Sequence, residues 1–311
     1  MDELTQSLDA FGLWDWVCVV ANLLTAIIGI YALKCWRNLP GKAGTPTTLI
    51  SDAIMGLCTG ILSFGIIFGM VTGIVSQAFS THFGISQAHL FTSAFCGQLA
   101  AAASMLAISA LAPRTLDWEP SVGTDEPKPE GSPLRQALRG FSLPRVLLAL
   151  LSIFALGLAA TLIWKGFHIA WEQLFLHGWA GQPPADEPQE IVDAVLKTDV
   201  ESWRFATIVL AVTIGAPIME ELAFRGMIYP GLLRLGAVTE RHSRWIAIVL
   251  TGALFSAAHL SPSAALPLFA FGAFMCLVRD RYGLITCMAV HCSFNLWNLV
   301  WLKLAPNAST L

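Results

Sequence analysis

The chain has 311 residues, of which 55% are hydrophobic and only 13% are charged, and its formal net charge is -3. Apolar runs of about 18 residues or more recur along it, which predicts membrane-spanning helices and argues against a soluble globular domain. No basic cluster with interleaved aromatic residues occurs, so nucleic acid is not an expected partner. We therefore expect an all-α polytopic membrane protein surrounded by the lipid bilayer.

Eight apolar segments are predicted to span the membrane. The fifth begins at Trp203 and runs into two adjacent glutamates, and the others cover residues 14–33, 53–75, 90–111, 144–164, 245–260, 264–278 and 284–302. An acidic amphipathic piece, residues 187–199, is predicted to lie at the membrane interface. The pattern divides the chain into an N-terminal three-helix region of unassigned role (1–112), a polar cytoplasmic linker (113–143) and a C-terminal core (144–311).

The basic residues are distributed unevenly among the predicted loops. With the N-terminus outside, fourteen of the 18 Lys and Arg residues fall on the cytoplasmic side, and only Lys165, Lys197, Arg204 and Lys303 fall outside. An excess of basic residues in cytoplasmic loops is typical of multi-pass membrane proteins. We therefore expect a multi-pass protein of the cell membrane with both ends outside.

Two adjacent carboxylates, Glu220 and Glu221, stand at the end of the fifth apolar segment. Ionisable residues inside a span are costly and indicate a functional site. Arg225 follows Glu221 by four residues, the helical spacing of a salt bridge, whereas Glu220 points about 100° away and is free to face a cavity. Adjacent buried carboxylates also discourage each other's ionisation, which suits one of them to act as a general base. Pro217, one turn earlier, is predicted to kink the helix and to free carbonyls that line a wet pocket.

Further polar residues occur in the last predicted spans. His259 follows Phe255 by four residues, and His291 and Asn295 are one helical turn apart on one face. A carboxylate, two histidines and an asparagine suit amide hydrolysis, in which some activate water and others donate to the oxyanion. The same types of side chain also bind zinc, although no HExxH motif is present. The residues alone leave both mechanisms open.

The depths of these residues in the membrane conflict if all the helices are straight. Counted from the cytoplasmic side at 1.5 Å per residue, His259 lies about 20 Å deep, His291 only about 10 Å, and Glu220 nearer still. We therefore predict that the helix of His259 begins outside the interface, or that the turn at Ser261–Pro262 is buried in protein.

Three motifs in this order resemble the CAAX-processing and bacteriocin-processing (CPBP) intramembrane protease family, also called the Abi family. Its members include the prenyl-protein endoprotease and lysostaphin resistance protein A. The motifs are EExxxR at Glu220–Arg225, FxxxH at Phe255–His259 and HxxxN at His291–Asn295. The resemblance covers roughly residues 200–302, which makes residues 144–311 a CPBP-like protease core.

The resemblance implies an intramembrane endopeptidase. By it, Glu220 and His259 activate the water, His291 and Asn295 stabilise the oxyanion, and the Glu221–Arg225 pair supports the site. The family has been described both as metalloproteases and as metal-independent glutamate-type proteases, which leaves zinc as a candidate cofactor. The substrate is expected to be a membrane-associated peptide or protein that enters from the cytoplasmic side or laterally from lipid.

Two other functions use the same residues. A non-proteolytic scaffold or immunity-type protein keeps the fold without the chemistry, and its phenotype survives replacement of Glu220. A proton-coupled transporter uses Glu220, Glu221 and the histidines as a proton relay. Many transporters contain an internal repeat, and this sequence has none that relates its two halves.

Overall fold

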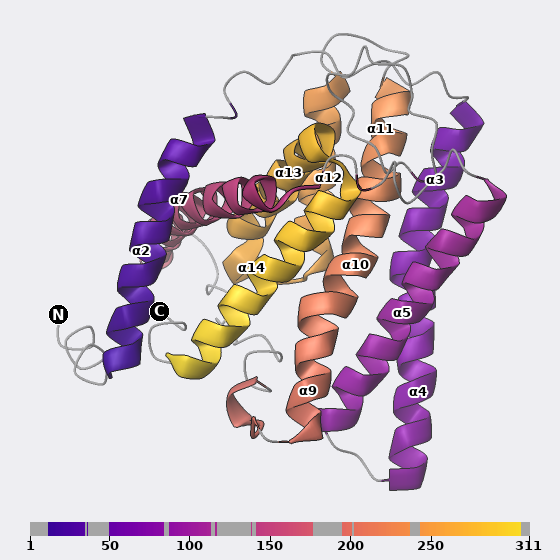
Figure 1. Cartoon of the computed structure of the whole chain (residues 1–311), viewed down its shortest axis with the longest axis horizontal. Helices are drawn as coiled ribbons and strands as arrows, with labels where there is room; N and C mark the ends of the chain where they lie inside the picture. The colour runs from indigo at the N-terminus through magenta and orange to yellow at the C-terminus, as the bar shows by residue number, and fades with distance from the viewer. Residues whose placement is uncertain are drawn as a thin grey trace.

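The computed structural model describes residues 12–34, 36, 50–83, 87–112, 116, 138, 141–176, 195–200, 202–236 and 243–305. Helices occupy all eight predicted span positions, and no strand occurs within the described residues (Figure 1). The predicted all-α polytopic fold is therefore confirmed. The helical elements are α2 (Leu13–Lys34), α3 (Ile50–Leu62), η1 (Ser63–Ile67), α4 (Phe68–Phe83), α5 (Gln87–Leu111), α7 (Leu143–Leu176), α9 (Trp203–Leu210), η2 (Ala211–Gly215), α10 (Ala216–Glu221), η3 (Leu222–Ile228), α11 (Tyr229–Gly236), α12 (Ser243–Ala258), η4 (Pro262–Ala264), α13 (Ala265–Tyr282) and α14 (Leu284–Leu304).

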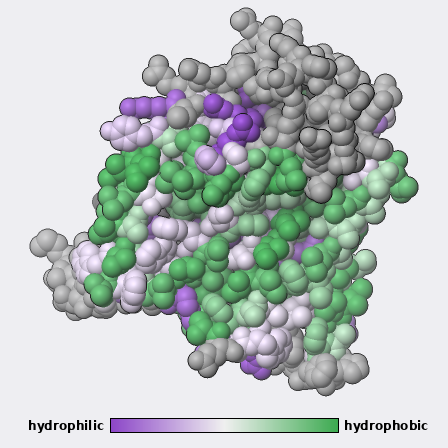
Figure 2. Space-filling model, viewed as in Figure 1, coloured by the Kyte–Doolittle hydropathy of each residue, from purple (hydrophilic) through white to green (hydrophobic). Residues whose placement is uncertain are grey.

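Six described helical segments are long and apolar enough to cross a membrane by themselves. They are Leu13–Lys34, Ser51–Ser80, Phe91–Leu111, Leu143–Phe167, Trp203–Leu235 and Leu284–Leu304. Of the other two predicted spans, α12 is a shorter apolar helix, and α13 ends in the charged sequence Arg279–Asp280–Arg281. Hydrophobic residues cover most of the visible face of the molecule below the hydrophilic residues at its upper edge, as lipid contact requires (Figure 2).

The fifth span does not stop at the double glutamate. α9, η2, α10, η3 and α11 follow one another without a break, and the apolar segment Trp203–Leu235 is 33 residues long. The prediction that the fifth span ends at the double glutamate is therefore wrong. Arg225 is fully buried and paired inside the protein, so its charge does not end the span. Glu220 consequently lies near the middle of a long helix.

This longer helix removes the conflict between the depths of Glu220 and His259. Glu220 lies roughly 24 Å from the helix end at Gly236, at 1.5 Å per residue. His259 lies roughly 24 Å from the start of α12 at Ser243, by the same rise. Gly236 and Ser243 are close in the sequence, so the two helices start from the same side and reach a similar depth.

His291 reaches this level because the turn before α14 is itself buried. Gly283 adopts φ 81°, a conformation that favours glycine, and donates its N–H to the Arg279 carbonyl at 2.8 Å. Leu284, the first residue of α14, is 0% exposed. Of the two alternatives offered for His259, the buried turn at Ser261–Pro262 is not observed, since Pro262 is exposed and Ser261 only half-buried.

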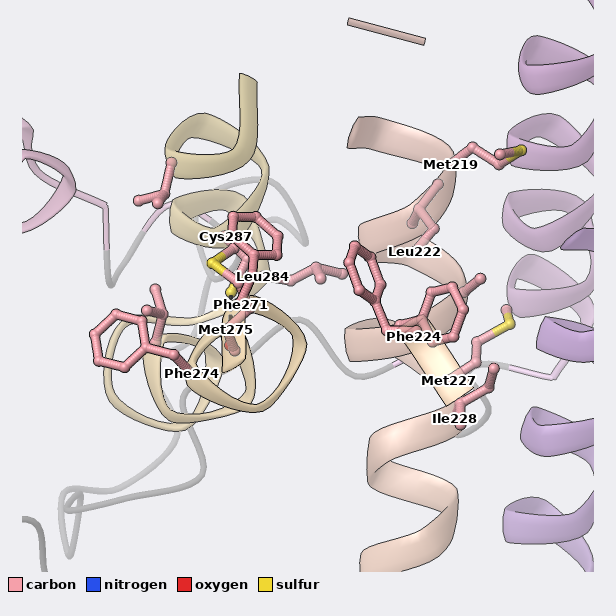
Figure 3. Close-up of a cluster of buried hydrophobic side chains, with 14 of the residues drawn as sticks. Met219, Leu222, Phe224, Met227, Ile228, Phe271, Phe274, Met275, Leu284 and Cys287 are labelled. Atoms are coloured by element: carbon pink, nitrogen blue, oxygen red, sulfur yellow. Dashed lines mark hydrogen bonds between the residues drawn. The ribbon is translucent and has the colours of Figure 1, made fainter. Parts of the chain in front are cut away.

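The N-terminal spans pack directly on the motif-bearing helix. A Cβ on Gly60 of α3 would lie 3.2 Å from the Ala223 carbonyl oxygen and 3.3 Å from Met227 Cβ, so a larger residue requires these neighbours to move apart. Figure 3 shows Met219 and Met227 pointing toward the violet ribbons of the N-terminal spans. α3 thus forms one wall beside the candidate site.

Two predicted segments lie largely outside the described residues. The linker, 113–143, is described only at isolated positions and at its end, where α7 begins. Of the interfacial piece 187–199, the described part contains a short helix whose Val195 is buried against Leu299 of α14. The Lys303 ammonium donates to three carbonyls of this short segment at 2.8–3.3 Å, which fixes it against the end of α14.

Candidate active site

A buried cluster joins the first and third motifs. Glu221 Oε1 accepts a hydrogen bond from Arg225 Nη1 at 3.0 Å and lies 2.7 Å from His291 Nδ1. The Glu221 and Arg225 side chains are both 0% exposed, and that of His291 is 5% exposed. Because a carboxylate only accepts, the short contact assigns a proton to His291 Nδ1. The predicted ion pair between Glu221 and Arg225 is confirmed.

The buried arginine also has partners on neighbouring helices. Arg225 Nη2 donates to the Gly272 carbonyl of α13 at 3.0 Å, and the guanidinium carbon lies 4.6 Å from the centre of the Phe255 ring. The carbonyl comes within reach because α12 and α13 approach closely at Gly252 and Gly272. Additional bonds of this kind help to offset the cost of burying an ion pair, although Arg225 Nε has no hydrogen-bond partner among the described residues. Arg225 therefore links three helices around Glu221.

The two adjacent glutamates have different surroundings. Glu221 is completely enclosed, whereas the Glu220 side chain is 12% exposed. Glu220 Oε2 lies 3.8 Å from His291 Nε2, too far for a hydrogen bond, and has no hydrogen-bond partner among the described residues. Glu220 is therefore the less enclosed of the two carboxylates, and His291 lies within 3.8 Å of both.

His259 stands at the end of α12, where its ring is held by its own helix. Its Nδ1 lies 2.7 Å from the Phe255 carbonyl oxygen. Since a carbonyl only accepts, Nδ1 carries the proton, and Nε2 keeps a lone pair for a base or a ligand. The Phe255 ring lies between the two histidines, with its centre 4.6 Å from that of His259 and 6.2 Å from that of His291. No hydrogen bond or ion pair joins His259 to Glu220 in the described part of the chain.

Asn295 and His291 both face the helix that carries the glutamates, as their spacing predicts. Asn295 Nδ2 donates to the Val212 carbonyl oxygen at 2.8 Å. One of its two amide hydrogens is thus committed to the backbone of η2, and the second remains for another acceptor. The six predicted residues therefore form a tight centre of Glu220, Glu221, Arg225 and His291, with His259 and Asn295 attached through Phe255 and Val212.

Several contributors to this site were not predicted. Gly272 supplies the carbonyl for Arg225, Val212 supplies the one for Asn295, and the Phe271 ring packs edge-on against His291 at 4.8 Å. The glycines at 252 and 272, on consecutive predicted helices, were an available signal of close helix approach.

A metal site does not emerge from this arrangement. Within the described residues, no group of three or more His, Cys, Asp and Glu side chains is positioned to hold one metal ion. Glu221 Oε1, the nearest carboxylate oxygen to His291, already binds Arg225. We therefore derive no step through a metal, and zinc stays a prediction that the structure does not test.

The site is thus a buried glutamate–histidine–arginine cluster within a helical membrane protein. Residues 202–297 match the family model described as Type II CAAX prenyl endopeptidase Rce1-like. This match supports the CPBP/CAAX protease family that the three motifs predict, and that family implies a protease. The match contains all six predicted site residues and none of the first three spans. Comparison with curated proteins and with solved structures gave no match.

Proposed function

We propose that the protein is an intramembrane endopeptidase that cleaves a peptide bond of a membrane-associated substrate with water activated by Glu220 and His259. The observation that carries the proposal is the contrast between the glutamates. Glu221 Oε1 is fixed by Arg225 and His291 and the Glu221 side chain is 0% exposed, whereas the Glu220 side chain is 12% exposed and its Oε2 lies 3.8 Å from His291 Nε2, too far for a hydrogen bond. A carboxylate in this condition suits a general base.

The first step is attack of water on the substrate carbonyl carbon. Glu220 takes one proton from the water as the new C–O bond forms, and the Nε2 lone pair of His259 accepts a hydrogen bond that orients the same water. Glu220 then returns the proton to the leaving nitrogen as the C–N bond breaks, so the two products are a carboxylic acid and an amine. The Nδ1–H bond to the Phe255 carbonyl keeps His259 in the required tautomer.

The oxyanion formed in this step needs hydrogen-bond donors. Asn295 offers the amide hydrogen that is not bound to Val212. His291 offers a second donor when Nε2 carries a proton; its Nδ1 lies 2.7 Å from Glu221, and its Nε2 lies 3.8 Å from Glu220. Donors of this kind, fixed in a site that excludes water, contribute strongly to hydrolysis.

The setting of the site favours a membrane-associated substrate. Exposed apolar side chains surround the helices, and Glu220 lies near the middle of a 33-residue span. The matched family is named for prenylated CAAX proteins, which are anchored to membranes. We propose an N-terminus outside the cell membrane and a substrate that enters from the cytoplasmic side or from lipid.

A cleavage assay in proteoliposomes tests this function. The substrates are a panel of membrane-anchored peptides, prenylated and unprenylated, and the variants are Glu220→Gln and His259→Ala, with Thr207→Ala as a control on the same helical stretch. Loss of a general base should lower kcat about 10²–10⁴-fold, while Thr207→Ala keeps the wild-type rate. Retained cleavage in both site variants contradicts the assignment.

Two further arms separate the alternatives. Proton flux without cleavage in the same proteoliposomes supports a transporter, and neither activity, with a phenotype that survives Glu220→Gln, supports a scaffold. Repeating the assay with chelator and with zinc added back decides whether the reaction requires a metal.

A further inference from the structure

Two π-helical segments of the motif-bearing helix are each followed by a proline. In η2, the Ala216 N–H bonds the Ala211 carbonyl five residues back, and the next residue is Pro217. In η3, the Tyr229 N–H bonds the Phe224 carbonyl in the same way, and the next residue is Pro230. Proline has no N–H and its ring collides with the carbonyl four residues earlier, so a locally widened helix accommodates it.

The first proline leaves a defined carbonyl without its helical partner. In the i→i+5 pattern, the residue that would donate to the Val212 carbonyl is Pro217, which has no hydrogen to give. Asn295 Nδ2, from α14, donates to this same oxygen at 2.8 Å. An unpartnered carbonyl in the middle of a span is costly, so the position of Asn295 follows from the missing donor of Pro217.

We propose that Pro217 is a positioning residue for hydrolysis, because it reserves the Val212 carbonyl for the Asn295 amide. The bond holds Asn295 one turn beyond His291 and against the helix that carries Glu220, with the second amide hydrogen left for the substrate oxyanion. This inference rests on the proposed function and deepens it. It assigns a role to a residue that makes no contact with the reacting atoms.

Replacing Pro217 with alanine supplies an N–H and allows the α-helical pattern to resume. The Val212 carbonyl then gains a donor from its own helix, and Asn295 loses its fixed partner. Because alanine suits a helix interior far better than proline, the variant should melt no lower than the wild type. A structural role alone predicts that activity and stability fall together, whereas positioning predicts a fall in activity alone.

The experiment is a double-mutant cycle with Pro217→Ala and Asn295→Ala, read by kcat and by thermal unfolding in detergent. Pro144→Ala is the matched control, since Pro144 stands at the start of α7, where an N–H has no helical acceptor. We expect Asn295→Ala to lower kcat about 10²-fold. Pro217→Ala should lower kcat about tenfold with KM nearly unchanged, and the double variant should be no slower than Asn295→Ala, because both act through one amide.

The unfolding arm does not depend on proteolysis. With Pro217 present, Asn295→Ala exposes an unpartnered carbonyl and should lower the melting temperature by roughly 3 °C or more. With alanine at 217, the same change should have little effect, because the helix itself bonds Val212. Additive effects on melting, or wild-type kcat in Pro217→Ala, overturn the inference. If Glu220→Gln still cleaves while the melting effects are coupled, the proposed function fails and the Pro217–Asn295 link stands.

Discussion

Replacing Arg225 with methionine tests whether a buried ion pair holds the site together. The side chains of Arg225 and Glu221 are both 0% exposed, their closest atoms are 3.0 Å apart, and the arginine also bonds the Gly272 carbonyl. Removing one partner of a buried pair costs about 3–5 kcal/mol, because the other charge is left uncompensated. At about 2–4 °C per kcal/mol, Arg225→Met should lower the melting temperature by roughly 6–20 °C.

The reasoning also predicts a rescue. Adding Glu221→Gln to Arg225→Met removes both charges, and the glutamine carbonyl still accepts from His291 Nδ1. Replacing a buried ion pair by neutral residues of similar size is often close to neutral in stability. We therefore expect the double variant to recover most of the loss, with a coupling energy of about 2–3 kcal/mol.

The assay is thermal unfolding of the two single variants and the double variant, in one detergent at one pH. Arg225→Lys serves as the matched control, because lysine keeps the charge but lacks the planar guanidinium that reaches Glu221 and Gly272 together. Its melting temperature should lie between those of the wild type and Arg225→Met. Two results would contradict this reasoning: a double variant that loses as much stability as the two single variants combined, or an Arg225→Met variant that melts within about 2 °C of the wild type. Either result would show that the Glu221–Arg225 ion pair does not stabilise the site.

Two smaller predictions concern the packing around the site. Gly60→Ala places a methyl group against the Ala223 carbonyl and should lower the free energy of unfolding by about 1–3 kcal/mol. Gly65→Ala is the control: a Cβ there meets nothing within 4 Å, so the change should be neutral or slightly stabilising in the same unfolding assay. Equal effects of the two changes would contradict the close packing of α3 against the motif-bearing helix. Tyr229→Phe removes the hydroxyl that donates to Asp280 Oδ2 at 2.7 Å inside the protein, and it should lower the free energy of unfolding by about 1–3 kcal/mol. An unchanged melting temperature would show that this hydrogen bond makes no net contribution to stability.

The sequence predicted those parts of the site that depend on helical spacing. Glu221 and Arg225 are four residues apart and form the expected ion pair, and His291 and Asn295 both face the helix of the glutamates. The difference between Glu220 and Glu221 was also predictable, because adjacent helical residues point about 100° apart. These features need only the geometry of one helix.

Contacts between helices were not predictable in the same way. The carbonyls that bind Arg225 and Asn295 belong to Gly272 and Val212, which carry no polar side chain and leave no signal of their own. The depth of Glu220 was misjudged because Arg225 resembled a loop residue. A single sequence shows that an arginine is charged, but the ion pair that makes its burial tolerable lies in the three-dimensional structure.

Buried arginines also affect the prediction of membrane orientation from loop charges. Four of the arginines counted as cytoplasmic are buried in the structure, namely Arg225, Arg234, Arg244 and Arg279. Removing them from the fourteen leaves ten basic residues against four, so the expected excess on the cytoplasmic side keeps its sign. The 33-residue segment is about 50 Å long, against a hydrocarbon core of about 30 Å, so Glu220, near its middle, is expected to lie within the hydrocarbon core. A scissile bond reaches this depth only with its polar backbone desolvated, and a substrate already anchored in the membrane meets that requirement at lower cost than a soluble peptide does.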